Sequence, residues 1–248
     1  MGIVIKHNIS PKVVISRKAN CLAKPIKDIL SSTSWKDRRC FIIAGGPSLI
    51  DFDFSTIKDE LVIGVNKSFI KFPATINYGM DMGFYDKITN SNSTDVRLVQ
   101  LHQQWLAYRG VKVFLMRPNF KLDPSVYVVN NIKEKTLSFD FDKGIYGANN
   151  SGWGALALAI VLGATKIGLL GYDMKVDNVA KRTHWHKGYI NQRFDSMQSK
   201  LDKFKKPFEE LAPVIVDAGI KVVNLNKNSG LDCFPKDSLK NFLQNYSK

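Results

Sequence analysis

The feature that most constrains the fold is the run at 40–49, where five apolar residues lead directly into Gly45-Gly46-Pro47-Ser48. This pattern predicts a buried strand, a tight turn and the start of a helix. Two glycines without a Cβ let another group approach the backbone, and Pro47 suits a first helical position. Free amides and the helix dipole at such a start favour an anion. The loop therefore predicts one wall of a phosphate site, with a plain strand-to-helix turn as the alternative.

Further apolar runs alternate with helical segments along the chain. Strands are expected at 40–44, 61–65, 75–80, 96–100, 111–116, 166–170 and 221–225, and loop and edge structure at 119–146. Helices are expected around Trp105 and Tyr108, from Asn150 to Ala164, at 193–218 and from Asp237, and a helix or a turn is expected at 49–58. The alternation predicts an α/β fold, a three-layer Rossmann-like sandwich with a mainly parallel sheet. One nucleotide-binding domain at 38–248, after a basic N-terminal extension at 1–37, is the expected organisation.

The composition describes a strongly basic protein with enough apolar residues for a core. Lys and Arg number 36 against 22 Asp and Glu, a net charge of +14, which should attract polyanions. No run reaches the roughly 18 apolar residues of a membrane span, and the N-terminus lacks a signal-peptide core. Three cysteines without metal-ligand spacing indicate a reducing compartment, so a cytoplasmic location is expected.

Polar or small residues follow the predicted strands and open the second long helix. In a parallel sheet these positions share the carboxyl edge, where ligands bind. The candidate binding residues are Gly45, Gly46, Pro47, Ser48, Asn66, Asp81, Asn150, Ser151, Gly152 and Gly171. Helix starts at Ser48 and Ser151 are expected to face an anion, while Asn66 and Asp81 are expected to hold sugar or base. Asn66, Asp81 and Ser151 would equally serve as ordinary caps, and Asp173 adds an acid at the same edge.

Two nucleotide signatures are absent. No Gly-Lys-Ser/Thr follows Gly45-Gly46, and the G-x-G-x-x-G spacing is missing, which argues against Walker-type ATP hydrolysis and against dinucleotide chemistry. Asp-Phe-Asp occurs at 51–53 and 140–142, a pattern that can hold a divalent cation. Neither triplet clearly ends a strand, so no metal site is predicted.

The segment His184-Trp185-His186 supplies the candidate catalytic groups. In an extended segment both imidazoles share one face. One of them is suited to act as a general base toward an acceptor hydroxyl, with a metal pair or incidental loop histidines as the other interpretations. Lys181, Arg182 and Lys187 around them suit a lid that closes over phosphates.

The order of these motifs also resembles that of a known protein family. Gly45-Gly46-Pro47-Ser48-Leu49, Asn66, Asn150-Ser151-Gly152 and Gly171-Tyr172-Asp173 occur in the order found in the bacterial sialyltransferases that build lipooligosaccharide. The chain also resembles a related group of phage and bacterial proteins that includes the archaeal 6-hydroxymethylpterin diphosphokinase-like family. The match covers roughly 38–240.

The resemblance implies a Rossmann-like nucleotide-binding domain. A CMP-sugar would lie across Gly45 to Ser48, Asn66, and Ser151 with Gly152. Asp173 would correspond to the strand-end acid, and His184 or His186 to the base of a reaction that needs no metal.

The expected function is a glycosyltransferase that uses a CMP-, UDP- or GDP-linked sugar without a further cofactor. Its acceptor would be anionic, a glycolipid or a nucleic acid, and the sequence is compatible with a homo-oligomer. The catalytic candidates are His186, His184 and Asp173. Two alternatives remain: an Mg²⁺-dependent pterin-type pyrophosphokinase with Asp81 or Asp173 as ligands, and a non-enzymatic nucleotide- or nucleic-acid-binding module.

Overall fold

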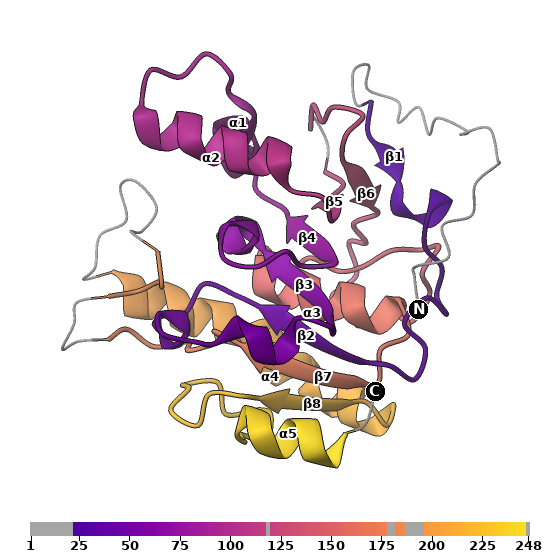
Figure 1. Ribbon diagram of the computed structural model, residues 1–248. Coiled ribbons are helices and arrows are strands. Elements are labelled where there is room, and N and C mark those ends of the chain that lie inside the picture. Colours follow the sequence, from indigo (N-terminus) through magenta and orange to yellow (C-terminus); the bar gives the residue numbers. More distant parts are fainter. Residues whose placement is uncertain (1–21, 118–119, 178–181, 187–195, 247–248) are drawn as a thin grey trace.

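The computed structural model describes residues 22–117, 120–177, 182–186 and 196–246. Its centre is one eight-stranded sheet in the order β1-β6-β5-β4-β3-β2-β7-β8, with every pair of neighbours parallel (Figure 1). The strands are β1 (Lys24–Pro25), β2 (Arg39–Ile43), β3 (Leu61–Val65), β4 (Ile76–Gly79), β5 (Val111–Leu115), β6 (Tyr127–Val129), β7 (Lys166–Leu170) and β8 (Lys221–Asn224). The α-helices are α1 (Met82–Thr89), α2 (Val96–Ala107), α3 (Ser151–Val161), α4 (Met197–Asp217) and α5 (Leu239–Asn245).

The sheet lies between two helical layers, which confirms the predicted α/β sandwich. Successive side chains of a strand point to opposite faces. In β2, Cys40 and Ile42 accordingly pack in the core under α3 and α4, whereas Phe41 and Ile43 pack in the core under α5. A third cluster places α1 and α2 against β5 and β6 on this second face.

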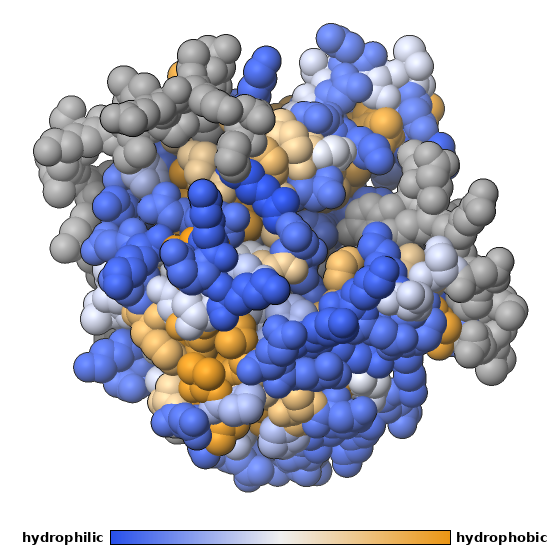
Figure 2. Space-filling view, turned by 180° about the vertical axis from the view of Figure 1, so that it is seen from behind, coloured by the Kyte–Doolittle hydropathy of each residue, from blue (hydrophilic) through white to orange (hydrophobic). Residues whose placement is uncertain are grey.

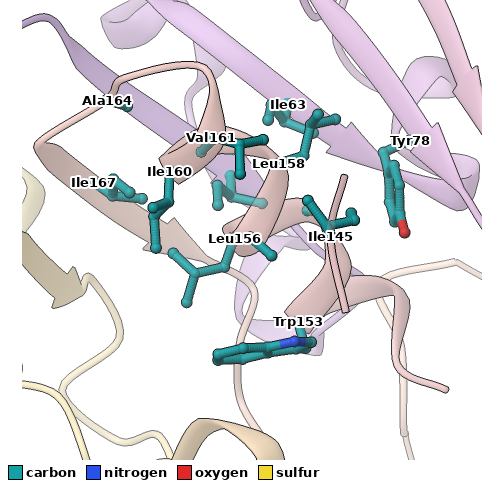
Figure 3. Packing of buried hydrophobic residues seen from close by; sticks show 14 of the residues in the cluster. Ile63, Tyr78, Ile145, Trp153, Leu156, Leu158, Ile160, Val161, Ala164 and Ile167 are labelled. Carbon is teal, nitrogen blue, oxygen red and sulfur yellow. The ribbon is translucent and has the colours of Figure 1, made fainter. Parts of the chain in front are cut away.

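Helix α3 is the centre of the main core. It is buried along its length from Trp153 to Val161, as its apolar sequence predicted (Figure 3). The Trp153 indole donates to the Tyr146 carbonyl oxygen over 2.8 Å, so the one polar atom of that ring is paired inside the core. Gly163, with a φ of +95°, ends the helix in a left-handed turn that favours glycine.

One local prediction was wrong, and another is settled in favour of turns. Residues 96–100 form the start of α2 and not a strand, because Asp95 accepts from the Arg97 amide as an N-cap and the apolar residues continue at helical spacing. Around 49–58, where a helix or a turn was expected, there are two 3₁₀ turns, Pro47–Leu49 and Phe54–Ile57. The Asp53 carboxylate accepts from the Ser55 amide and starts the second turn separately.

Part of the N-terminal extension is built into the domain. Of residues 1–37, the structure describes 22–37; the rest lies outside the described residues. Strand β1 pairs with β6 at the edge of the sheet, and Ile26 and Trp35 are buried in the same core as α3. These residues therefore stabilise the sandwich directly.

Hydrophilic residues cover most of the surface seen from behind, with apolar groups in separate patches (Figure 2). Within the described ranges, no helix combines the length and apolar character needed to cross a membrane.

Candidate functional site

A cavity of about 720 Å³ lies at the carboxyl ends of the central strands. The residues that follow β2, β3, β4, β5 and β7 line it, together with the start of α3 and the first turns of α4. The size falls within the range of small-molecule sites. Because all strands are parallel, polar segments far apart in the sequence meet here, as the sequence predicted.

The Gly-Gly-Pro-Ser loop is folded around the carboxylate of Asp173. The Ser48 amide donates to Asp173 Oδ1 over 3.2 Å and the Ser48 hydroxyl donates to Oδ2 over 2.9 Å. Asn226 Nδ2 donates to Oδ1 over 2.9 Å. A Cβ on Gly46 would lie 1.6 Å from Asp173 Oδ2, so only glycine fits. Burial raises the pKa of Asp173, and the hydrogen bonds from Ser48 oppose that rise.

Gly45 makes room for the histidine segment in the same way. A Cβ at Gly45 would lie 3.0 Å from His184 Cδ2. The Trp185 amide donates to the Gly45 carbonyl oxygen over 3.0 Å, and the indole N–H donates to the Ala44 carbonyl oxygen over 3.2 Å. The loop thus brings Asp173 and His184 into one wall of the cavity.

The two imidazoles of this segment are stacked. The ring centroids of His184 and His186 are 4.9 Å apart at an interplanar angle of 22°, and Thr183 Oγ1 is hydrogen-bonded to His184 Nδ1 at 2.8 Å. Burial, followed by the charges of Lys67 and Lys200, lowers the pKa of His184 to about 4. Burial, followed by His184 and Lys67, lowers the pKa of His186 to about 3. Both rings are therefore neutral at pH 7 and able to accept a proton.

Basic side chains outnumber acidic ones around the cavity. The basic side chains are Lys67, Lys87, Arg117, Lys175 and Lys200, and the acidic ones are Asp81 and Asp173. Burial, with Lys87 and Arg97 adding to it, lowers the pKa of Lys67. This excess of positive charge favours an anionic ligand.

Sequence reasoning did not identify these basic residues. Lys67 comes directly after Asn66, and Arg117 lies two residues after β5, so the strand-end rule could have found both. Lys87 and Lys200 lie on α1 and α4, where no sequence signal separates them from ordinary surface lysines.

The start of α3 is capped by the chain itself. Asn150 Oδ1 accepts from the Gly152 and Trp153 amides over 2.9 and 3.1 Å, and its Nδ2 donates to the Phe204 carbonyl oxygen over 2.8 Å. A Cβ on Gly152 would lie 3.1 Å from a ring carbon of Tyr172, whose hydroxyl donates to the Gly152 carbonyl oxygen. Ser151 lines the cavity beside them.

Asn66 and Asp81 open the loops that follow β3 and β4. Asn66 has a φ of 52°, a left-handed conformation, and its carbonyl oxygen accepts from the buried Asn77 side chain over 3.0 Å. Asp81 Oδ1 accepts from the Phe84 amide over 2.8 Å as the N-cap of α1. Both residues line the cavity, and Arg117 lies in its wall with a hydrogen bond to Asn149 Oδ1.

The cavity brings together most of the predicted site residues. Those that line it are Gly45, Gly46, Asn66, Asp81, Asn150, Ser151, Gly152, Gly171, Asp173, His184 and His186. Pro47 and Ser48 are not among its lining residues, and the expected helix start at Ser48 is a turn of three residues.

The remaining candidates lie elsewhere. Neither Asp-Phe-Asp triplet lines the cavity, and in the part of the chain that the structure describes no three His, Cys, Asp or Glu side chains are grouped as a metal site. Lys181 and Lys187 of the expected lid lie outside the described residues. Arg182 lies in a bridge, with two backbone hydrogen bonds to Asp177.

Comparisons with family models, with curated proteins and with solved structures find no match for this chain.

Proposed function

We propose that the cavity binds a nucleotide-linked sugar and that the protein transfers the sugar to an acceptor hydroxyl. The observation that carries this proposal is a pair of neutral imidazoles in the wall of a cationic cavity. The cations would neutralise a leaving phosphate, and an imidazole would take the acceptor's proton. These are the two requirements of transfer from an activated phosphate ester.

The phosphates would bind to the basic side chains and not to the glycine loop. The Ser48 amide and hydroxyl both donate hydrogen bonds to the Asp173 carboxylate. The Gly46 amide donates a hydrogen bond to the Gly171 carbonyl oxygen. Lys67 and Arg117 supply charged donors in the cavity wall after β3 and β5, the two strands that flank β4. Charge-assisted hydrogen bonds of this kind are stronger than neutral ones.

The nucleoside would occupy the part of the cavity that has aromatic walls. Phe84 and Phe120 lie on the side of α1 and β5, and Phe204 lies on α4. Aromatic faces stack on any base. Asn66 and Asp81 would hold the sugar or base hydroxyls beside them.

In the proposed step, His184 or His186 removes the proton from the acceptor hydroxyl. The acceptor oxygen forms a bond to the anomeric carbon of the donor, and the bond from that carbon to the phosphate oxygen breaks. The electron pair of that bond leaves with the nucleotide, whose added negative charge is stabilised by the basic side chains. The positive charge of the cavity also favours an anionic acceptor, a glycan or a nucleic acid.

Donor hydrolysis tests this proposal, because glycosyltransferases of this kind would pass the sugar slowly to water. The protein is incubated with CMP-, UDP- and GDP-linked sugars, and the release of nucleotide is measured. We expect turnover with one base class. A chain that releases no nucleotide from any donor would not support the proposal.

The histidine variants make the test specific. The double variant His184→Gln/His186→Gln should lose roughly 10²- to 10⁴-fold in rate, the usual contribution of a general base, while donor binding persists. His102→Gln is the matched control, because His102 pairs with the Ile88 carbonyl oxygen and does not line the cavity. Parallel reactions with ATP and Mg²⁺ test the pyrophosphokinase alternative, and salt-dependent binding of DNA or RNA tests the non-enzymatic one.

A further inference from the structure

We propose that the stacked histidine pair takes up a proton when an anion binds beside it, so that anion and proton occupy the cavity together. This inference rests on the proposed function for its place in the reaction, although the coupling itself needs only the cavity. It concerns phosphate- or sulfate-like groups bound against Lys67 and Lys200.

The stacked geometry disfavours a positive charge on the two rings when no anion lies beside them. The ring centroids of His184 and His186 lie 4.9 Å apart, so a proton on one ring opposes a proton on the other. The Trp185 ring lies edge-on to His186, and its amide and indole N–H hold the segment on the Ala44 and Gly45 carbonyl oxygens. These hydrogen bonds hold the backbone between the two rings against the loop.

The charged groups around the pair have mostly the same sign. Lys67 and Lys87 face the cavity from the side of β3 and α1, Arg117 from β5, Lys175 from β7 and Lys200 from α4; Lys71 lies over the Trp185 ring at 5.4 Å. The acids are Asp81, which caps α1, and Asp173, which accepts hydrogen bonds from Ser48 and Asn226. An anion added to this set supplies the negative charge that a protonated imidazole needs.

An anion beside Lys67 would make the local charge favour protonation of an imidazole. It offsets the charges that oppose protonation, and it accepts a hydrogen bond from an imidazolium. Both effects raise the pKa of a neighbouring histidine toward neutrality. By reciprocity, a protonated histidine strengthens the binding of the anion, so affinity increases as the pH falls.

This coupling would activate the catalytic base only after the donor has bound. A base works best when its pKa lies near the operating pH. In the empty cavity the imidazoles are weak bases, and the phosphates of a bound donor would make one of them strong enough to deprotonate the acceptor. The donor thus prepares the base.

The test uses inorganic sulfate, which stays a dianion across the pH range of the experiment. Histidine ring signals of the whole protein are followed by NMR from pH 7.5 to 4.5, in sulfate and in chloride of equal ionic strength. We expect one cavity histidine to titrate at least one pH unit higher in sulfate. We also expect sulfate to bind about twofold more tightly at pH 5.0 than at pH 7.5, because a one-unit rise from a pKa of about 4 is only partly expressed at pH 5.0.

Three controls decide the result. His102 supplies the reference ring signal in both salts, because it lies outside the cavity. His184→Gln/His186→Gln should bind sulfate with little dependence on pH, and Lys67→Met should reduce the difference between the two salts. Equal sulfate affinity at both pH values, the same dependence in the double variant, or no sulfate binding would overturn the proposal. Because sulfate carries no sugar, a protein inactive with every donor can still show the coupling, and an active protein can lack it.

Discussion

The two sides of the cavity use their polar groups in different ways. On the side of β2 and β7, the loop at Gly45–Ser48 and Asp173 satisfy one another, with the Ser48 amide and hydroxyl both bound to the Asp173 carboxylate. On the side of β3 to β5, Lys67 and Arg117 line the cavity as charged side chains. The polar groups of the first side bind one another, and those of the second side place positive charge in the cavity wall.

The difference teaches how to interpret a glycine-rich loop. A glycine after a strand indicates that something approaches the backbone closely. At Gly46 the approaching group is the carboxylate of Asp173, and at Gly45 it is the ring of His184. The loop is required here by the chain's own side chains, before any ligand is considered.

The largest expected effect is on the supporting side. Gly46→Ala should destabilise the protein by about 3 kcal/mol or more, because the added Cβ would lie 1.6 Å from Asp173 Oδ2 and 2.4 Å from the Gly171 carbonyl oxygen. Denaturant unfolding measures this loss. Gly83→Ala is the control, since its added Cβ would come no nearer than 3.3 Å to Asp81 Oδ1. Equal stability of the two variants would refute the close packing of the loop.

The histidine pair should make stability depend on pH. The pKa of both rings is lower in the folded protein than the ordinary 6.5, so the unfolded chain binds more protons below that value. Stability should therefore fall as the pH decreases from about 6.5 toward 4. Relative to His184→Gln/His186→Gln, the wild type should lose about 4 kcal/mol between pH 7 and 5, with about 2 kcal/mol from each ring. Parallel stability curves for the two proteins would show that the rings are not held in this environment.

The smallest expected effects, on pyrophosphate binding and on stability, distinguish the two sides of the cavity. Lys67→Met should weaken the binding of inorganic pyrophosphate at pH 7.5 by roughly tenfold, the value of one charge-assisted hydrogen bond, with little change in stability. Ser48→Ala should do the reverse: it should cost about 1 kcal/mol of stability, because Asp173 loses a donor, and leave pyrophosphate binding nearly unchanged.

Calorimetry and unfolding on both variants supply the two measurements. Lys203→Met, at an exposed position of α4 away from the cavity, is the charge-matched control. If Ser48→Ala weakens pyrophosphate binding as much as Lys67→Met, the loop binds phosphate after all.

Local sequence signals predicted most of the fold. The runs at 61–65 and 166–170 coincide with β3 and β7, and the alanine-rich run beginning at Asn150 and Ser151 is α3. The failures occurred where short apolar runs are ambiguous. The run at 96–100 suits a strand or a helix equally, and only the Asp95 cap and the burial of Leu101 and Trp105 decide for a helix.

The candidate site was predicted in part, for a related reason. The strand-end rule depends only on chain order, so it found Asn66, Asp81 and Asp173. Whether such a residue faces a ligand or another side chain depends on partners far along the chain. Asp173 is 125 residues from Ser48, and no local pattern reports that pairing.

The sequence by itself determined the parallel α/β architecture and the edge at which the polar residues meet, because hydrophobic period and strand-end position are local properties of the chain. Only the tertiary structure decided which polar groups pair with one another there and which charged side chains line the cavity. Packing joins Ser48 to Asp173 and Asn150 to the first amides of α3, while it places Lys67 and Lys200 in the wall of the cavity. The charge of the cavity and the neutral state of His184 and His186 are consequences of that packing, since burial and neighbouring charges exist only once the chain has folded.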